Sequence, residues 1–128
     1  MTIAMSPALL QLMAGVYGFL AVALGAFAAH GLKSRLDAYA LDIMATATQY
    51  ALLHAVVLLA LSLAPADNRW LGWAGMAFVC GTFVFSGSLY ALALSGVRAL
   101  GAMTPIGGLL LLIGWGLLIV GAAIRLTR

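Results

Sequence analysis

Hydrophobic residues run through this chain in long uninterrupted stretches, and the charged residues fall in the gaps between them. Four such stretches cover approximately residues 7–29, 43–64, 70–95 and 99–124. Each exceeds the roughly 20 residues that an α-helix needs to cross the hydrocarbon core of a bilayer. None alternates between apolar and polar residues as barrel strands do, and a backbone in lipid must satisfy its own hydrogen bonds. The pattern predicts an all-α integral membrane protein, a single domain over residues 1–128 with a bundle of four transmembrane helices.

The links between the stretches are short, and the first one has a pattern of its own. Residues 64–69 connect the second and third predicted helices, and residues 95–98 connect the third and fourth. In the first link, Ser34-x-x-Asp37 fits a capping box that starts a helix. The apolar residues that follow share one helix face. This favours a short amphipathic segment over about residues 35–43, which either lies at the lipid headgroups or forms the protruding start of the second helix.

Composition supports the membrane interpretation and excludes several classes of protein. Hydrophobic residues make up 66% of the chain, charged residues only 7%, and the mean hydropathy is +1.18. An ordinary soluble domain is about 25% charged, so this chain cannot be a water-soluble monomer. A single cysteine excludes an internal disulfide framework. The net charge of +3 is scattered rather than clustered, so we expect no nucleic-acid partner. The partner that we expect is the lipid bilayer.

Charge gives little information about orientation. Four helices place both termini on one side of the membrane. One side carries Arg69, Arg125 and Arg128, and the other carries Lys33, Arg35 and Arg98. The two sides thus carry equal numbers of Lys and Arg, so the positive-inside rule gives no orientation. Only the N-terminal amine favours termini in the cytoplasm. No Lys or Arg precedes the first stretch, which is also long for a signal peptide, so we expect a retained helix.

Glycines recur at helical spacing in two of the predicted helices. Gly107, Gly114 and Gly121 are seven residues apart in the fourth, as are Gly18 and Gly25 in the first. In lipid, glycine allows two helix backbones to approach closely. These glycines are candidate helix-packing residues, either within the bundle or in a homo-oligomer or larger membrane complex.

Polar residues inside the predicted helices form a candidate centre, because polar groups are costly in hydrocarbon. Thr46, Tyr50 and His54 lie four residues apart along the second helix, and further polar residues lie within the third and fourth predicted helices. The candidate residues are Thr46, Gln49, Tyr50, His54, Ser86, Ser88, Tyr90 and Thr104. They either line a small polar pocket with His54 as its titrating group, or make the interhelical hydrogen bonds that fix the packing.

Catalytic and metal-binding patterns are missing from the sequence. There is no Glu, and the three Asp residues lie outside the predicted membrane cores, which disfavours an exchanger that depends on an embedded carboxylate. His30 and His54, the only histidines, are expected at different depths, so joint ligation of a metal or haem is disfavoured. We expect no metal, no cofactor and no catalytic residue, and hence a non-enzymatic protein.

Short motifs in all four predicted helices resemble those of a known family. They are Gly25-Ala26-Phe27-Ala28-Ala29-His30-Gly31-Leu32, Gln49-Tyr50 with His54-Ala55, Phe85-Ser86-Gly87-Ser88-Leu89-Tyr90-Ala91-Leu92, Thr104-Pro105-Ile106-Gly107-Gly108 and Gly114-Trp115. In this order they resemble the YgdD-type family of small bacterial inner-membrane proteins, whose conserved domain has no known function. The resemblance covers nearly the whole chain and implies a four-helix protein of the bacterial inner membrane, but it implies no activity.

Two functional hypotheses follow. The first is a structural or accessory protein that associates with other membrane components through its outer helix faces. The alternative is a small-solute channel, facilitator or ligand-binding membrane protein with a polar centre around His54.

Overall fold

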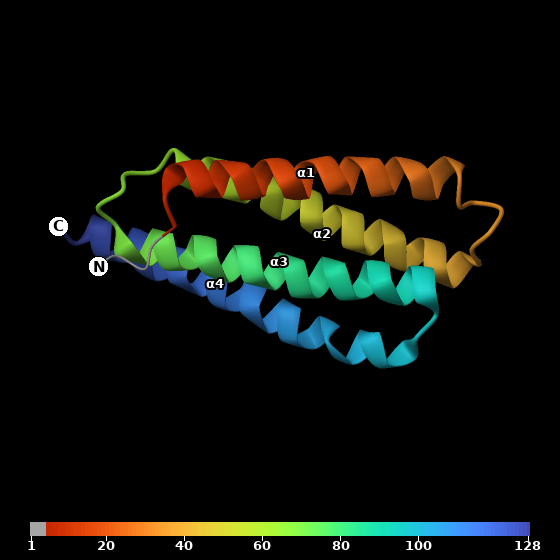
Figure 1. Cartoon of the computed structure of the whole chain (residues 1–128). Helices are drawn as coiled ribbons and strands as arrows, with labels where there is room; N and C mark the ends of the chain where they lie inside the picture. The colour runs from red at the N-terminus through yellow and green to blue at the C-terminus, as the bar shows by residue number, and fades with distance from the viewer. Residues whose placement is uncertain (1–4) are drawn as a thin grey trace.

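Four long helices lie side by side and alternate in direction in a computed structural model, which describes residues 5–128 (Figure 1). They are α1 (Pro7–His30), α2 (Ala38–Ser62), α3 (Arg69–Ser95) and α4 (Thr104–Leu126), with a short 3₁₀ helix, η1 (Arg98–Ala102), before α4. All four long helices are long and apolar enough to span a membrane. The predicted all-α fold with four such helices is confirmed, and α1 begins at the end of the bundle where α4 ends.

Side chains at the helix ends explain where three of the helices begin. The Ser6 hydroxyl accepts a hydrogen bond from the Leu9 backbone nitrogen at 3.2 Å, and proline follows as the first helical residue of α1. The Asp37 carboxylate accepts one from the Ala40 nitrogen at 2.8 Å and starts α2. Asn68 does the same for α3, and accepts from the Trp70 nitrogen at 3.1 Å. Each side chain satisfies a backbone N–H that has no partner within its helix.

The first link differs from the expected capping box. The residue that caps α2 is Asp37, not Ser34, and the chain between α1 and α2 consists of turns rather than a helix. Residues 38–43 belong to the first turns of α2 and continue directly into the spanning helix. Residues 38–43 of the expected amphipathic segment therefore lie in α2, and residues 35–37 lie in the link before it.

The fourth helix also begins later than expected. Residues 98–102 form η1, and α4 itself starts at Thr104 with Pro105 in its first turn. Proline is favoured there because the first turn of a helix needs no donor from it.

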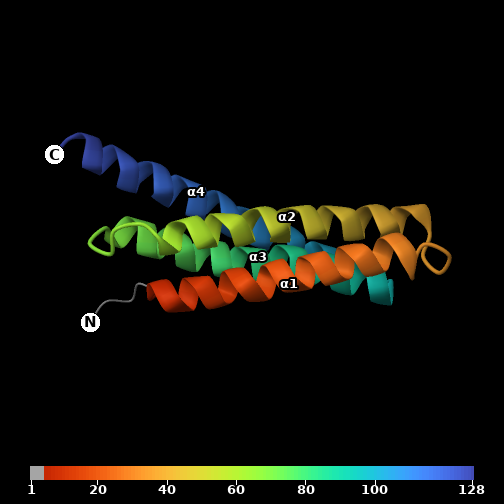
Figure 2. The same cartoon turned by 90° about the horizontal axis from the view of Figure 1, so that it is seen from above.

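The core of the bundle lies where α1, α2 and α4 meet α3. Its largest cluster of buried residues comprises Leu10, Ala14, Tyr17, Ala55, Leu58, Ala74, Phe78 and Leu111. Of the four helices, α3 is the most buried and α4 the least. Figure 2 shows why, since the C-terminal end of α4 leans away from the other three helices.

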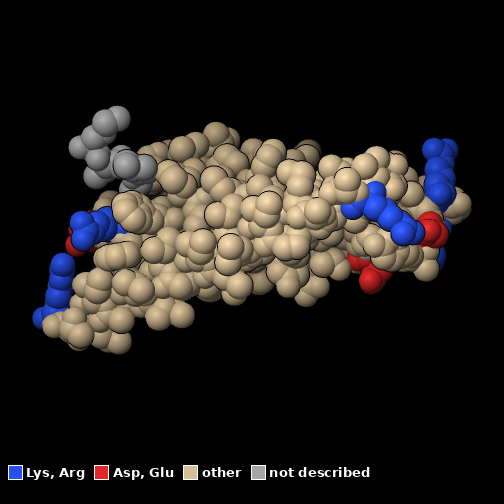
Figure 3. Space-filling model, turned by 90° about the horizontal axis from the view of Figure 1, so that it is seen from below, with Lys and Arg blue, Asp and Glu red and all other residues tan. Residues whose placement is uncertain are grey.

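Charged side chains lie at the two ends of the bundle. Figure 3 shows Lys, Arg and Asp side chains at both ends of one face and a long stretch between them without charge. Trp70 and Trp73 lie at the start of α3, and their ring centroids are 6.2 Å apart. Aromatic residues at the ends of an apolar band are typical of proteins that sit across a bilayer.

Candidate functional site

His54 is buried in the middle of α2, and both of its ring nitrogens have partners. Its side chain is 2% exposed. Nδ1 lies 2.8 Å from the Tyr50 carbonyl oxygen, and Nε2 lies 3.3 Å from Nε1 of Trp115 on α4. An indole N–H can only donate and a carbonyl can only accept, so a neutral imidazole with its proton on Nδ1 satisfies both contacts.

Aromatic rings surround this histidine. The centroid of the His54 ring lies 5.4 Å from that of Phe78 and 6.0 Å from that of Trp115. Tyr50 stacks on the imidazole with 6.1 Å between the ring centroids, and the Phe85 ring centroid lies 4.4 Å from that of Tyr50. These rings join α2, α3 and α4 by packing, in the separation range typical of aromatic pairs.

The serines and the tyrosine predicted on α3 make hydrogen bonds between helices. The Ser86 hydroxyl donates to the Ala47 carbonyl of α2 at 2.8 Å. Tyr90 and Thr48 of α2 share a hydrogen bond of 2.6 Å between their hydroxyls. The bond to α4 joins the side-chain oxygens of Ser88 and Thr104 at 2.7 Å.

The outer part of the predicted stripe on α2 does not join this network. The Thr46 hydroxyl donates to the Asp42 carbonyl of its own helix at 3.1 Å. Gln49 is exposed, and Tyr50 is 39% exposed. The eight predicted residues therefore separate into two groups. His54, Ser86, Ser88, Tyr90 and Thr104 contact neighbouring helices through polar atoms, whereas Thr46, Gln49 and the Tyr50 side chain do not.

A groove lies beside the network, between α1 and α2. Its volume is about 600 Å³, and most of the residues that line it are small or apolar. Gln49 and Thr48 line its α2 side, and Lys33, from the turn after α1, also lines it. His54 is not among its lining residues, so the groove and the buried histidine are separate features.

Three polar contacts were not anticipated from the sequence. Tyr17 of α1 donates its hydroxyl to the Val79 carbonyl of α3 at 2.6 Å. Thr48 lies outside the predicted stripe but pairs with Tyr90. Trp115 is not among the candidate polar residues, yet its indole donates to His54. A tyrosine or tryptophan placed inside a membrane helix is itself a signal, because its polar atom needs a partner when buried.

The spaced glycines lie where helices approach one another. A Cβ atom built on Gly107 would lie 2.7 Å from the Cα of Phe85, and one on Gly114 would lie 2.7 Å from the Phe78 ring. On Gly121 it would lie 3.0 Å from the Trp70 side chain. The two α1 glycines face α2, where a Cβ on Gly25 would meet Thr48 at 2.9 Å and one on Gly18 would only touch Ala55 at 3.8 Å. It stays a prediction that the close approaches at these glycines hold the bundle together in lipid.

The chemistry available in this centre is limited by its partners. His54 contacts a backbone carbonyl and an indole, neither of which is a nucleophile. His30 lies far from it in sequence, exposed at the end of α1. Within residues 5–128, no group of three or more His, Cys, Asp or Glu side chains lies close enough together to hold a metal ion. In the same range, one buried side-chain polar atom lacks a hydrogen-bond partner, the hydroxyl oxygen of Thr82.

Known proteins share this sequence over most of its length. A family described as "Protein of unknown function (DUF423)" matches residues 24–108. The UPF0382 inner membrane protein YgdD of Escherichia coli K12 is 40% identical over 126 residues, which is 97% of this chain and 95% of that protein. A UPF0382 membrane protein of Haemophilus influenzae is 46% identical over 99 residues, 77% of this chain and 80% of its own length.

A staphylococcal protein is also similar to the chain. The UPF0382 membrane protein SSP2132 of Staphylococcus saprophyticus is 42% identical over 106 residues, 80% of this chain and 86% of that protein. No solved structure is significantly similar to the chain. The motif resemblance, the match to the family and the four spanning helices agree, and the chain belongs to the DUF423 family of membrane proteins of unknown function, which includes YgdD.

Proposed function

We propose that this chain is a non-enzymatic structural or accessory protein of the inner membrane, which associates with other membrane components through the outer faces of its helices. The observation that carries the proposal is the use of its buried polar groups. Ser86, Ser88 and Tyr90 all bond to neighbouring helices, and both nitrogens of His54 are engaged. Such bonds orient helices against each other and leave few groups available for chemistry.

The outer surface of α4 supports association with another helix. Leu109, Leu112 and Ile119 are exposed there by 59%, 69% and 68%. Between them lies Gly116, where an added Cβ would meet nothing within 4 Å. A small residue on an exposed apolar helix face permits close approach of a second transmembrane helix.

Photo-crosslinking in cells tests this proposal. A benzophenone amino acid at Leu112 points outward, and the same group at Leu111, which is 4% exposed, points into the core and serves as the control. We expect a discrete protein adduct from position 112 and none from position 111. Adducts of lipid size only, at position 112 and at the exposed Phe19 and Phe83 of other helices, would contradict the proposal.

A second candidate function is a small-solute channel or ligand-binding protein centred on His54. One observation favours it, because the buried Thr82 hydroxyl has no partner and a water molecule or ligand atom would supply one. The hydrogen bonds at His54 count against it, since a conducting or binding histidine would need a free nitrogen. Solute flux into proteoliposomes that is lost in the His54→Phe variant would favour this candidate over the accessory role.

We infer that both termini lie on the cytoplasmic side of the membrane. The names of the relatives support an inner-membrane location, and the structure has α1 begin where α4 ends. The N-terminal amine, on which the expectation of cytoplasmic termini depended, lies outside the described residues. Reporter fusions after residue 128, active on one side of the membrane only, test this inference.

A further inference from the structure

A basic pocket lies at the end of the bundle where α3 begins and α4 ends. Its volume is about 560 Å³, and it is lined by Asp67, Asn68, Arg69, Trp70, Ile124, Arg125 and Arg128. Three guanidinium groups and one carboxylate give this lining a formal charge of about +2. Half of all the cations in the chain therefore surround one cavity.

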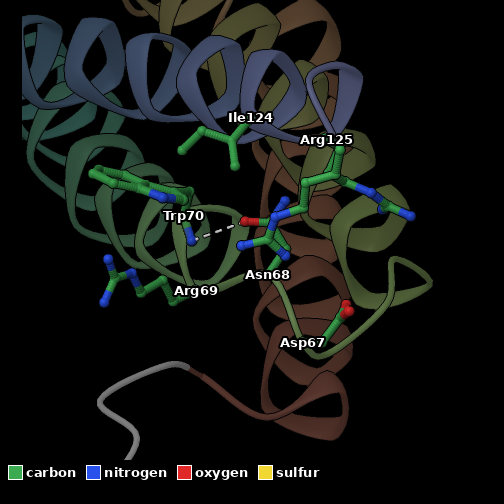
Figure 4. A pocket seen from close by; sticks show the side chains of 7 residues that line it. Asp67, Asn68, Arg69, Trp70, Ile124 and Arg125 are labelled. Carbon is green, nitrogen blue, oxygen red and sulfur yellow. Dashed lines mark hydrogen bonds between the residues drawn. The ribbon is translucent and has the colours of Figure 1, made fainter.

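The base of the pocket is held in place by hydrogen bonds. The Asn68 amide donates to the Gly121 carbonyl of α4 at 3.2 Å and accepts from the Trp70 nitrogen at 3.1 Å. Figure 4 shows Asn68 and Trp70 on one side of the pocket and Ile124 and Arg125, from the end of α4, on the other. One side chain thus ties the start of α3 to the last turns of α4.

The arginines have the chemistry of a phosphate site. A guanidinium presents a planar fork of N–H donors that matches two phosphate oxygens at once. Arg69 makes a cation–π contact, because its guanidinium carbon lies 5.6 Å from the centre of the Trp70 ring. Arg125 and Arg128 are three residues apart and lie near each other at the end of α4. The start of α3 adds the partial positive charge of a helix N-terminus.

The position of the pocket indicates where its ligand lies. The charged ends of the bundle stand at the level of the headgroups if the apolar middle fills the hydrocarbon core. Trp70 and Trp73 begin α3 at this same end, as interfacial aromatic residues do. Phosphate groups of lipids are concentrated at this depth, where Lys and Arg attract anionic headgroups.

We propose that the pocket formed by Arg69, Arg125 and Arg128 binds a phosphate group, as carried by an anionic phospholipid headgroup or by a soluble phosphate compound. The Asp67 carboxylate opposes the anion and limits the affinity. This proposal goes beyond the accessory role and does not depend on it, because it concerns a ligand at the bundle end and not a partner at the outer helix faces.

Native mass spectrometry of the full chain in mild detergent tests the site. The protein is titrated with an equimolar mixture of phosphatidylglycerol and phosphatidylcholine, and we expect preferential retention of phosphatidylglycerol. The Arg125→Gln variant should bind it about fivefold more weakly, which is the effect of one interfacial arginine. Arg125→Lys should fall between the two, because it keeps the charge and loses the fork. Asp67→Asn should bind more tightly than the wild type.

The matched control is Arg98→Gln, which removes one cation from the opposite end of the bundle. It should leave phosphatidylglycerol binding unchanged within about twofold, since exposed charges that far apart are screened from each other. Equal losses in Arg98→Gln and Arg125→Gln would overturn the proposal and indicate diffuse surface attraction. If Arg125→Gln does not fold in detergent, Arg69→Gln takes its place.

A second arm separates the two sources of phosphate. Inorganic phosphate is added to the protein in zwitterionic detergent, and binding is read from the shift in thermal unfolding. A shift that Arg125→Gln abolishes would support the site with a soluble phosphate compound as its ligand. Retention of phosphatidylglycerol without such a shift would support a lipid headgroup. If the protein shows neither preferential retention of phosphatidylglycerol nor a shift with inorganic phosphate, the proposal is overturned.

Discussion

Alanine at Gly107 should weaken the contact between α3 and α4, whereas alanine at Gly116 on the same helix should not. A Cβ at position 107 would lie 2.7 Å from the Cα of Phe85, against an ordinary contact of 3.4–4 Å. The overlap is with backbone, which cannot rotate away as a side chain can. The two helices must therefore separate by several tenths of an ångström.

The magnitude follows from comparing two variants with the same chemical change. Overpacking a close helix contact costs about 1–3 kcal/mol. Alanine also gains up to about 1 kcal/mol over glycine in helix propensity, but this gain is common to both variants. At Gly116 an added Cβ meets nothing within 4 Å, so only the gain applies there. We expect Gly107→Ala to be about 1–3 kcal/mol less stable than Gly116→Ala.

Reversible unfolding in mixed micelles, followed by circular dichroism as the fraction of dodecyl sulfate rises, measures this difference. Equal stabilities within about 0.5 kcal/mol, well below the expected overpacking cost, would refute the close approach of α3 to α4 at Gly107. A larger loss in Gly116→Ala than in Gly107→Ala would place the tight contact on the outer face of α4, where a second copy or another protein would lie.

Three further predictions use the same unfolding assay. Thr48→Val and Tyr90→Phe should each lower stability by about 0.6–2 kcal/mol, and the double variant should lose less than the sum, because one hydrogen bond joins the two hydroxyls; strict additivity would argue against that bond. Trp115→Phe keeps an aromatic ring but removes the donor to the buried imidazole, so we expect a loss of about 1 kcal/mol, and wild-type stability would speak against the contact. Tyr17→Phe should cost about 1 kcal/mol through its lost bond to α3, whereas Tyr39→Phe, at a side chain 67% exposed, should be neutral; similar effects for both would count against this bond.

The fold could be predicted from the sequence because lipid restricts the choices. Long apolar stretches without charge admit helices only, and their number follows directly. The ends were harder to predict. Ser34 and Asp37 are both good capping residues three positions apart, and the path of the chain out of α1 decides that Asp37 caps α2. At the fourth helix, η1 occupies residues that hydropathy alone assigns to the span.

The candidate site was predicted only in part, for a geometrical reason. Spacing along α2 identifies which residues share a face, but it does not say which neighbour that face meets. His54 turns inward to Trp115, while Thr46 and Gln49, from the same predicted group, make no hydrogen bond to another helix in the described residues. The partner of Tyr90 is Thr48, 42 residues away, and no local pattern marks that pair.

The basic pocket shows the same limit. Arg69 ends the link before the third apolar stretch and Arg125 follows the fourth, so in the sequence each counts as one scattered charge. Only the antiparallel packing of α3 and α4, with Asn68 bonded to the Gly121 carbonyl, brings them to one cavity.

A structure of the protein in a lipid bilayer, at a resolution that shows water, tests the central claim most directly. The account predicts that the hydroxyls of Ser86, Ser88 and Tyr90 bond to neighbouring helices. It predicts that His54 accepts from Trp115 of α4 at Nε2 and donates to the Tyr50 carbonyl of its own helix from Nδ1. It also predicts no chain of water molecules from His54 to either membrane surface. A hydrated path or a bound solute against His54, with the indole displaced, would contradict the account and make this centre a conduction or binding site.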